Sequence, residues 1–332
     1  MDYTRCRNSL VVGLFCFLTA IAWSWPSWGA GMVTFSFDDG LSSVYEEAFP
    51  ILKKHRQRAT VGIVFSRVTS GRTSDYMTKK QVMELQKNGW EIASHGLTHQ
   101  RPTDIPKYFS DELLEGWKLE EGIQCQCVYE AKYDYEFIGG LTENDQHLRE
   151  LSSIEDIARV PGSYYFDRLV GAIHVHPFDP VPPKDLRIKS ISYQREMRDS
   201  KKGLEALGFD VSTYVAPYNY WTPEMRELSK YYYDQVANGG EAANYKGTFD
   251  RHWIKRFFIH TLGPADEVIR LVQKKAVSEN GWIILCFHGI EDETGWQPWS
   301  EENLEQLSAW LEEQGVRVVT IGEGAAILNE GE

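Results

Sequence analysis

The chain has 332 residues, a length that corresponds to about two average domains or to one barrel of the α/β type. Hydrophobic residues make up 42% and charged residues 25%, which is typical of a globular protein with a large core. The formal net charge of −13 leaves no basic surplus to neutralise phosphates, so it argues against nucleic acid as a partner.

Residues 1–30 have the pattern of a secretory signal peptide. Arg5 and Arg7 precede an apolar run over residues 10–25, and small residues follow it. We therefore expect export, to the periplasm or the extracellular space, and a mature domain over residues 31–332. An uncleaved membrane anchor is the alternative, because the tryptophans and the proline near residue 26 make a poor cleavage site. No later stretch is long and apolar enough to span a membrane.

The first segment after the leader, residues 33–37, is predicted to be a buried strand. It is rich in β-branched and aromatic residues, and it ends on Asp38, Asp39 and Gly40. Two adjacent carboxylates are costly to keep ionised together unless a cation or a proton is shared between them. Taken alone, the stretch is most simply a strand followed by a solvated turn.

The rest of the chain alternates between predicted helices and strands. The predicted elements are helix 42–55, strand 59–65, helix 78–88, strand 90–94, a helix ending at 207, strand 211–216, helix 222–232, strands 234–237 and 253–259, helix 264–278, strand 282–287, helix 300–313 and strand 317–321. This alternation predicts parallel strands joined by right-handed crossovers. About seven strands fit a closed or nearly closed barrel better than an open sheet.

The alternation fails between about residues 105 and 189, after the third strand. This stretch is rich in Pro, Tyr and Asp, and its periodicity is weak. We interpret it as an insertion of irregular structure that acts as a cap over a cleft, rather than as a separate core domain. The pairs Cys125/Cys127 and His174/His176 hint at a second metal site, although neither pair has zinc-finger spacing.

Polar side chains follow several of the predicted strands, and in a β/α barrel those strand ends share one rim. Asp38 and Asp39 end the first strand, His95 and His99 follow the third, and His288 follows strand 282–287. Two histidines four residues apart are able to grip one metal ion. With a carboxylate they supply two nitrogens and one oxygen, the ligand set of a hydrolytic zinc-type site with an open position. The second carboxylate would then stay free as a base.

The chain resembles the polysaccharide deacetylase family, whose domain is of the NodB-homology, carbohydrate esterase family 4 type. The resemblance covers most of residues 32–105 and 190–325. It rests on four ordered motifs, Ser36-Phe37-Asp38-Asp39-Gly40, Ser94-His95-Gly96-Leu97-Thr98-His99, Ala216-Pro217-Tyr218 and Leu285-Cys286-Phe287-His288. It implies a distorted (β/α) barrel and a divalent metal, zinc in the first place, with cobalt or nickel as alternatives. It also implies removal of N-acetyl groups from a polysaccharide that contains N-acetylhexosamine.

The resemblance also implies roles for individual residues. Asp39, His95 and His99 match the metal ligands, Asp38 matches the catalytic base and His288 the catalytic acid. A metal-activated water would attack the acetyl carbonyl while Asp38 takes its proton. An amine leaves poorly unless it is protonated, and a histidine has a pKa suited to that step.

The sequence departs from the family pattern at three positions. Val215 stands where the third motif usually carries an arginine that pairs with the base. Arg256, in predicted strand 253–259, either replaces that arginine or forms an ordinary surface ion pair. Gly96 stands where Ser or Thr is common, and the aspartate of the fourth motif has only a weak candidate in Asp250.

Aromatic residues near the motifs are candidates for contact with sugar rings. Trp221, Trp296 and Trp299 lie just beyond motif ends, and Pro217 and Tyr218 form part of the third motif. Most of the eleven tryptophans must nevertheless be packing residues.

Two other functions remain open from the sequence. The site does not distinguish an amide from an ester, so an O-acetyl esterase or another C–N hydrolase is one alternative. A non-catalytic carbohydrate-binding protein is the other, although the intact set of aspartates and histidines argues against it.

Overall fold

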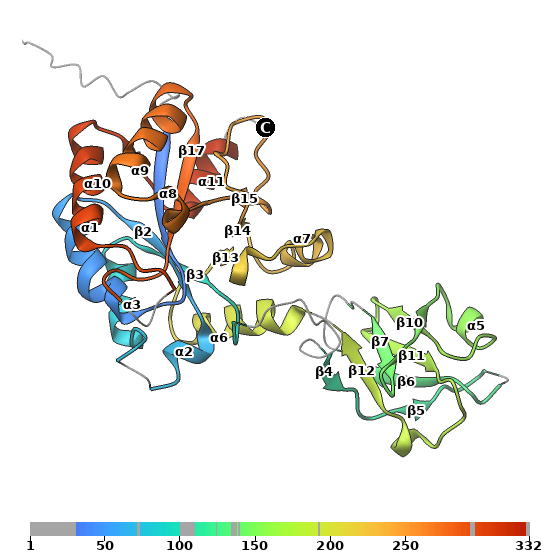
Figure 1. Ribbon diagram of the computed structural model, residues 1–332. Helices are drawn as coiled ribbons and strands as arrows, with labels where there is room; N and C mark the ends of the chain where they lie inside the picture. The colour runs from blue at the N-terminus through green and yellow to red at the C-terminus, as the bar shows by residue number, and fades with distance from the viewer. Residues whose placement is uncertain are drawn as a thin grey trace, which may run out of the picture.

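The computed structural model describes residues 31–329, apart from residues 72–73, 100–109, 124, 134–137, 139, 192 and 293–295. The predicted signal peptide lies outside the described residues. Within them, no helix combines the length and the apolar character needed to cross a membrane. Figure 1 shows a large body of helices around a parallel sheet and a smaller body of short strands, coloured green, beside it.

The large body is built on one sheet in which every described pairing is parallel. Its strands run in the order β15-β14-β13-β3-β2-β1-β17-β16, and β18 pairs with the beginning of β1. The strands are β1 Met32–Phe37, β2 Ala59–Ile63, β3 Glu91–Ser94, β13 Thr213–Val215, β14 Gln235–Asn238, β15 Ile254–Lys255, β16 Phe257–Phe258, β17 Trp282–Phe287 and β18 Arg317–Val318.

One short segment brings the two edges of this sheet together. β15 pairs with β14 through Ile254, and β16 pairs with β17 through Phe257. Arg256 is the single residue between β15 and β16. The two strands are therefore halves of the predicted strand 253–259, and the sheet is nearly closed into a barrel. This confirms the predicted fold, a distorted (β/α) barrel of about seven parallel strands.

Helices surround the sheet in the order that the sequence predicts. Those labelled η are 3₁₀ or π segments, and several of them continue directly into an α-helix. The elements are η1 Val44–Ala48, α1 Phe49–Lys54, α2 Phe65–Val68, α3 Lys79–Lys87, η4 Arg195–Asp199, α6 Ser200–Ala206, η5 Pro217–Asn219, α7 Pro223–Ser229, α8 Ile259–Leu262, α9 Ala265–Val272, η6 Gln273–Ser278, α10 Glu301–Glu313 and α11 Ile321–Asn329.

Side-chain caps fix the beginnings of these helices where the sequence predicts them. Thr78 and Gln81 form both bonds of a capping box at the start of α3. The hydroxyl of Ser300 accepts from the backbone N–H of Asn303 at the start of α10. The last helix, α11, is not among the predicted elements, and it begins at Ile321, where the predicted strand 317–321 ends.

Apolar side chains fill the barrel at the end where its strands begin. Met32 of β1 and Trp282 of β17 are the first residues of their strands, and both pack with Ile321 and Ala325 of α11. Gly324 permits this contact, because a Cβ there would lie 2.4 Å from the Trp282 ring. The strand beginnings are thus closed by α11, and the carboxyl ends of the strands form the opposite rim.

The insertion after β3 is regular, so the prediction of irregular structure was wrong. It forms two sheets with the orders β5-β6-β11-β10-β9 and β4-β12-β7-β8. Its elements are β4 Ser110–Leu113, β5 Lys118–Leu119, β6 Tyr129–Lys132, β7 Leu141–Glu143, β8 Gln146–His147, β9 Arg149–Glu150, α5 Ile154–Ile157, β10 Ser163–Asp167, β11 Ala172–His176, η3 Pro183–Asp185 and β12 Ile188–Ile191.

These strands escaped prediction because each is short and contributes few apolar residues. In β6, for example, only Tyr129 and Ala131 are buried. Such residues nevertheless form a core of their own, together with Tyr164, Ile173 and Ile188. The insertion therefore holds a hydrophobic core separate from that of the barrel. Its role as a cap over a cleft stays a prediction.

The structure also contradicts a second metal site built from the Cys125/Cys127 and His174/His176 pairs. The two cysteines form a disulfide with each other. Nδ1 of His176 lies 2.7 Å from the carbonyl oxygen of Ile157 and donates to it. His174 contacts Glu120 instead, at 3.0 Å. Sγ of Cys127 does lie 3.8 Å from Nδ1 of His176, but as part of a disulfide it offers no thiolate to a metal, and His174 groups with Glu120 and Glu130 instead.

Candidate active site

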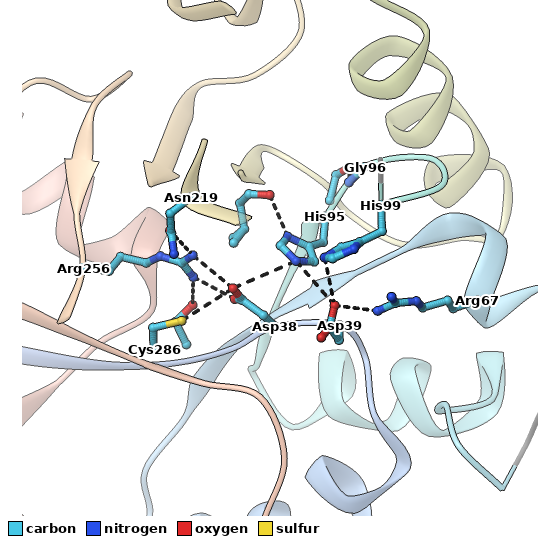
Figure 2. A network of polar contacts seen from close by, with 12 residues as sticks. Asp38, Asp39, Arg67, His95, Gly96, His99, Asn219, Arg256 and Cys286 are labelled. Carbon is cyan, nitrogen blue, oxygen red and sulfur yellow. Dashed lines mark hydrogen bonds and ion pairs between the residues drawn. The ribbon is translucent and has the colours of Figure 1, made fainter. Parts of the chain in front are cut away.

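The end of β1 turns two neighbouring carboxylates in different directions. Asp39 and Gly40 both have a positive φ, 74° and 69°, so the chain bends sharply after the strand. Asp38 is only 3% exposed. Figure 2 shows the Asp38 carboxylate turned towards Arg256, while that of Asp39 faces two histidines and Arg67.

Asp39, His95 and His99 bring three candidate metal ligands together. Nε2 of His99 lies 3.1 Å from Oδ1 of Asp39, and Nε2 of His95 lies 3.7 Å from the same oxygen. One ligand atom from each residue lies within 4.8 Å of the others. These separations suit an ion held by each ligand at about 2.0–2.2 Å, as in zinc sites.

The protonation of the two histidines also fits a metal. Nδ1 of His95 donates to the carbonyl oxygen of Val215 at 2.8 Å, which leaves a lone pair on Nε2. Burial lowers the pKa of His95. Burial, with the neighbouring His95 charge, lowers the pKa of His99 to about 3. Both imidazoles are therefore neutral at physiological pH, the form that binds a metal.

Arg67, in the short helix α2, is a neighbour of this group that the sequence did not reveal. Its guanidinium donates to Oδ1 of Asp39 at 2.5 Å. Burial would raise the pKa of Asp39, but the adjacent imidazoles of His95 and His99 and the guanidinium of Arg67 outweigh it and hold the pKa below its usual value. Asp39 is therefore ionised, and its carboxylate contacts Arg67 as well as the two histidines.

Arg256 reaches Asp38 across the inside of the barrel. Its two terminal nitrogens donate to the two carboxylate oxygens at 2.7 and 3.0 Å, a bidentate pair. Burial would raise the pKa of Asp38, but the charges of Arg256, His95 and His288 and the bonds from Arg256 hold it well below its usual range. Arg256 is fully buried, so it does not form an ordinary surface ion pair.

Three further groups fix this pair. Arg256 donates to the hydroxyl of Ser36 at 3.2 Å and to Oδ1 of Asn219 at 2.5 Å. The thiol of the buried Cys286 donates to Oδ2 of Asp38 at 3.5 Å. Gly239 leaves room for Asn219, since a Cβ there would lie 2.9 Å from its Cβ. Arg256, which follows β15 two strands away from Val215 of β13, thus pairs with Asp38.

The third motif forms the rim beside the metal ligands. Pro217 is buried, whereas Tyr218 is 55% exposed and its ring lies 4.6 Å from that of His99. Tyr218 and Asn219 both have a positive φ, 56° and 50°, which is uncommon for such residues. This bend turns the Tyr218 ring outwards and the Asn219 side chain towards Arg256.

His288 directly follows β17, whose last residue pairs with the last residue of β1. Its ring meets that of Trp296 edge to face at 5.2 Å, and His260 meets the same ring at 4.3 Å. Asp250, the weak candidate for tuning His288, instead binds Nε of Arg226 at 2.9 Å. The His288 ring is therefore packed against an aromatic ring.

The three predicted tryptophans differ in their surroundings. Trp296 is 52% exposed and lies against His288. Trp299 is buried and donates from its indole N–H to the carbonyl oxygen of Gly263. Trp221 is partly buried, packs on the core and donates to the carbonyl oxygen of His252 at 2.9 Å. Of the three, Trp296 has the most accessible ring.

Glycine at position 96 has a steric reason. Its φ is +83°, and a Cβ there would lie 3.0 Å from Oε2 of the buried Glu196. Glu196 lies beyond the insertion, and no local pattern in the sequence connects it with the histidine motif. Glu196 and Arg67 are thus the polar neighbours that sequence reasoning missed here.

The fold and this site together define a parallel β/α barrel whose rim carries a ligand set of the kind that holds catalytic zinc. Residues 28–118 match the family model described as polysaccharide deacetylase. This part carries the first two motifs, and the match confirms the resemblance to the polysaccharide deacetylase family that the motifs indicate.

Curated relatives agree with the family. The chain is 38% identical over 155 residues to poly-beta-1,6-N-acetyl-D-glucosamine N-deacetylase of Staphylococcus aureus (strain MSSA476). The aligned region covers 42% of this chain and 53% of that protein. The chain spans about half the length of the curated relatives it matches.

Two solved structures are similar over most of the chain. The peptidoglycan deacetylase PdaC from Bacillus subtilis is 14% identical, with 90% of this chain and 92% of that chain covered and a TM-score of 0.45. BA3943 from Bacillus anthracis, a family 4 pseudoenzyme, is 13% identical, with 91% and 66% covered and a TM-score of 0.45.

Proposed function

We propose that the protein is a metal-dependent deacetylase that removes N-acetyl groups from a polysaccharide containing N-acetylhexosamine. One observation carries the proposal. The ligand group of Asp39, His95 and His99 lies beside a second aspartate, Asp38, which Arg256 keeps ionised inside the barrel. The name of the Staphylococcus aureus relative supports an N-acetylglucosamine polymer as the substrate class.

The residues divide the work of such a reaction. A divalent metal bound by Asp39, His95 and His99, zinc in the first place, would act as a Lewis acid and lower the pKa of water. Asp38, ionised and held by two bonds from Arg256, is placed to accept a proton from the attacking water. His288 would donate a proton to the departing amine, with Trp296 against its ring.

We also propose that the protein is exported to the periplasm or the extracellular space. The support is the order of charged, apolar and small residues in residues 1–30. Export would bring the enzyme to a polysaccharide outside the cytoplasm. Fractionation of cells that express the full chain would test it, and retention of the full-length protein in the cytoplasm would contradict it.

Acetate release tests the activity. The purified protein, stripped with a chelator and reloaded with zinc, cobalt or nickel, is incubated with oligomers of β-1,6-linked N-acetylglucosamine, with peptidoglycan and with O-acetylated xylan. We expect acetate from the N-acetylated substrates only, and only with metal.

The other outcomes separate the alternatives. Acetate from xylan alone would indicate an esterase. Glycan binding without turnover by the metal-loaded protein would indicate a non-catalytic binding protein. Undiminished acetate release from the chelated protein would refute metal dependence.

A further inference from the structure

Glu196 contacts the loop that carries the metal ligand His99. Its Oε2 accepts the backbone N–H groups of Leu97 and Thr98 at 2.8 and 3.0 Å, and its Oε1 accepts the hydroxyl of Thr98 at 2.6 Å. One carboxylate thus binds both residues that precede His99. The two segments are 98 positions apart in the chain, on either side of the insertion.

The contact is buried and closely packed. Glu196 is 6% exposed, so its charge depends on these donors for compensation. Gly96 lies directly against the carboxylate. A Cβ added at this glycine would lie 3.0 Å from Oε2 of Glu196. A buried ionised group with several donors fixes its partners more firmly than a neutral acceptor would.

His99 needs such support because its own backbone is strained. Its φ is +61°, in the left-handed region that residues other than glycine adopt uncommonly. Such a conformation persists only when the surroundings impose it. By binding the backbone N–H groups of Leu97 and Thr98, Glu196 fixes the backbone that leads into His99.

The helix that carries Glu196 is itself anchored to the barrel. Ser200, one turn further on, bonds its hydroxyl to that of Ser94 at the end of β3, at 2.7 Å. Tyr193, before Glu196, bonds to the hydroxyl of Tyr214 in β13 at 2.9 Å. The residues on both sides of Glu196 are therefore hydrogen-bonded to strands of the barrel.

The same helix connects to the insertion. Gln194 is fully buried, its Nε2 donates to the hydroxyl of Tyr133 in the insertion at 3.5 Å, and its Oε1 accepts from Tyr232 at 2.8 Å. Only one residue thus separates Gln194, which contacts the insertion, from Glu196, which holds the His99 loop.

We propose that Glu196 is a positioning residue for His99, and that through it the segment returning from the insertion sets the geometry of the metal site. Glu196 is not a member of the candidate ligand group of Asp39, His95 and His99. The inference rests on the metal site of the proposed function and adds to it the residue that keeps the third ligand in place.

The test compares E196Q with E91Q in the full chain. The amide keeps the size of Glu196 and an oxygen for the two N–H groups, but it removes the negative charge and replaces Oε1, the acceptor of the Thr98 hydroxyl, by an NH₂ group. Glu91, at the opposite end of β3, is a matched control: its carboxylate accepts the hydroxyl of Thr60 at 2.8 Å and the N–H of Gly322 at 2.9 Å. Zinc affinity, the visible absorption spectrum with Co²⁺ and thermal unfolding of the metal-free protein are measured for each.

We expect E196Q to bind zinc about 10–100-fold more weakly than wild type and to change the Co²⁺ spectrum. E91Q should unfold earlier, yet keep the wild-type affinity and spectrum. The variant T98V loses only the hydrogen bond to Oε1 of Glu196, so it should weaken zinc binding less than E196Q does. T98V replaces E196Q in the test if E196Q does not fold.

Wild-type zinc affinity and spectrum in both E196Q and T98V would overturn the inference. Equal losses in E91Q and E196Q would overturn it as well, because they would show a general effect of stability. Failure of the wild type to bind zinc would instead refute the proposed metal site, so the two failures are distinguishable.

Discussion

Asp38 and Asp39 are neighbours in sequence with different surroundings. Asp38 points into the barrel and meets the fixed guanidinium of Arg256, whereas Asp39 lies at the rim among imidazoles and Arg67. Burial alone would raise the pKa of both carboxyl groups, but their cationic and imidazole neighbours lower it. The proposed division into base and ligand follows from those neighbours.

Replacing Asp38 by asparagine should separate the two roles. We expect acetate release to fall by about 10²–10⁴-fold, because the general base is lost. Zinc content, measured by atomic absorption, should stay at the wild-type level, with Asp39→Ala as the control that loses the metal. Loss of zinc from the Asp38→Asn variant would show that Asp38 is a ligand.

Replacing Arg256 by methionine should destabilise the protein strongly. Asp38 would remain buried without its partner, and breaking a buried ion pair from one side costs about 3–5 kcal/mol. Chemical unfolding of the metal-free protein at pH 7.5 measures this change. A loss below about 1 kcal/mol would be the value of an exposed ion pair and would contradict the contact.

The pH dependence of that loss has a definite sign. In the wild type the pKa of Asp38 is lower in the folded state than in the unfolded state, where it is about 3.9. The ionised Asp38 therefore stabilises the folded protein above that unfolded-state pKa, and this stabilisation is lost as the pH falls towards the folded-state pKa. Without Arg256, burial would raise the pKa of Asp38, and the carboxyl could fold protonated at low pH. The stability difference between Arg256→Met and wild type should therefore shrink between pH 7.5 and pH 4. A difference that grows would contradict this assignment.

At the scale of elements, strand β2 makes room for the imidazole of His95. A Cβ at Gly62 would lie 3.3 Å from Cβ and 3.4 Å from Cγ of His95. Glycine in a strand interior often marks such a close approach of a neighbouring group. The packing of β2 against β3 is thus part of the metal site.

We expect Gly62→Ala to displace the His95 ring by a few tenths of an ångström. Zinc affinity, measured by competition with a chelator, should fall about 10-fold, the lower end for a change that reorients a ligand. Unfolding of the metal-free protein shows whether the change also affects the core. Unaltered zinc affinity would indicate that the neighbouring side chains absorb the methyl group.

At the scale of the whole molecule, metal binding should stabilise the barrel, because the three ligands come from segments that only the folded chain brings together. Zinc at 100 times its dissociation constant should add about 2.7 kcal/mol to the free energy of unfolding. Thermal unfolding with zinc and with a chelator measures this. Asp39→Ala should remove the shift, and an equal shift in that variant would locate the zinc elsewhere.

The sequence by itself determined the elements of the barrel and the chemistry of its rim. Strands β1 and β17 and helices α3 and α10 were predicted closely, because apolar spacing and capping residues are local signals. The histidine spacing and the paired aspartates likewise indicated a metal site from residue type alone. The short strands of the insertion gave no such signal.

Only the tertiary structure decided which residues support that site. Arg256 and Asp38 are 218 positions apart, and they meet because the segment between β15 and β16 joins the two edges of the sheet. Glu196 binds the His99 loop across the insertion for a similar reason. Local patterns fix local geometry, whereas a contact between distant segments depends on how the whole chain packs, and no local pattern encodes it.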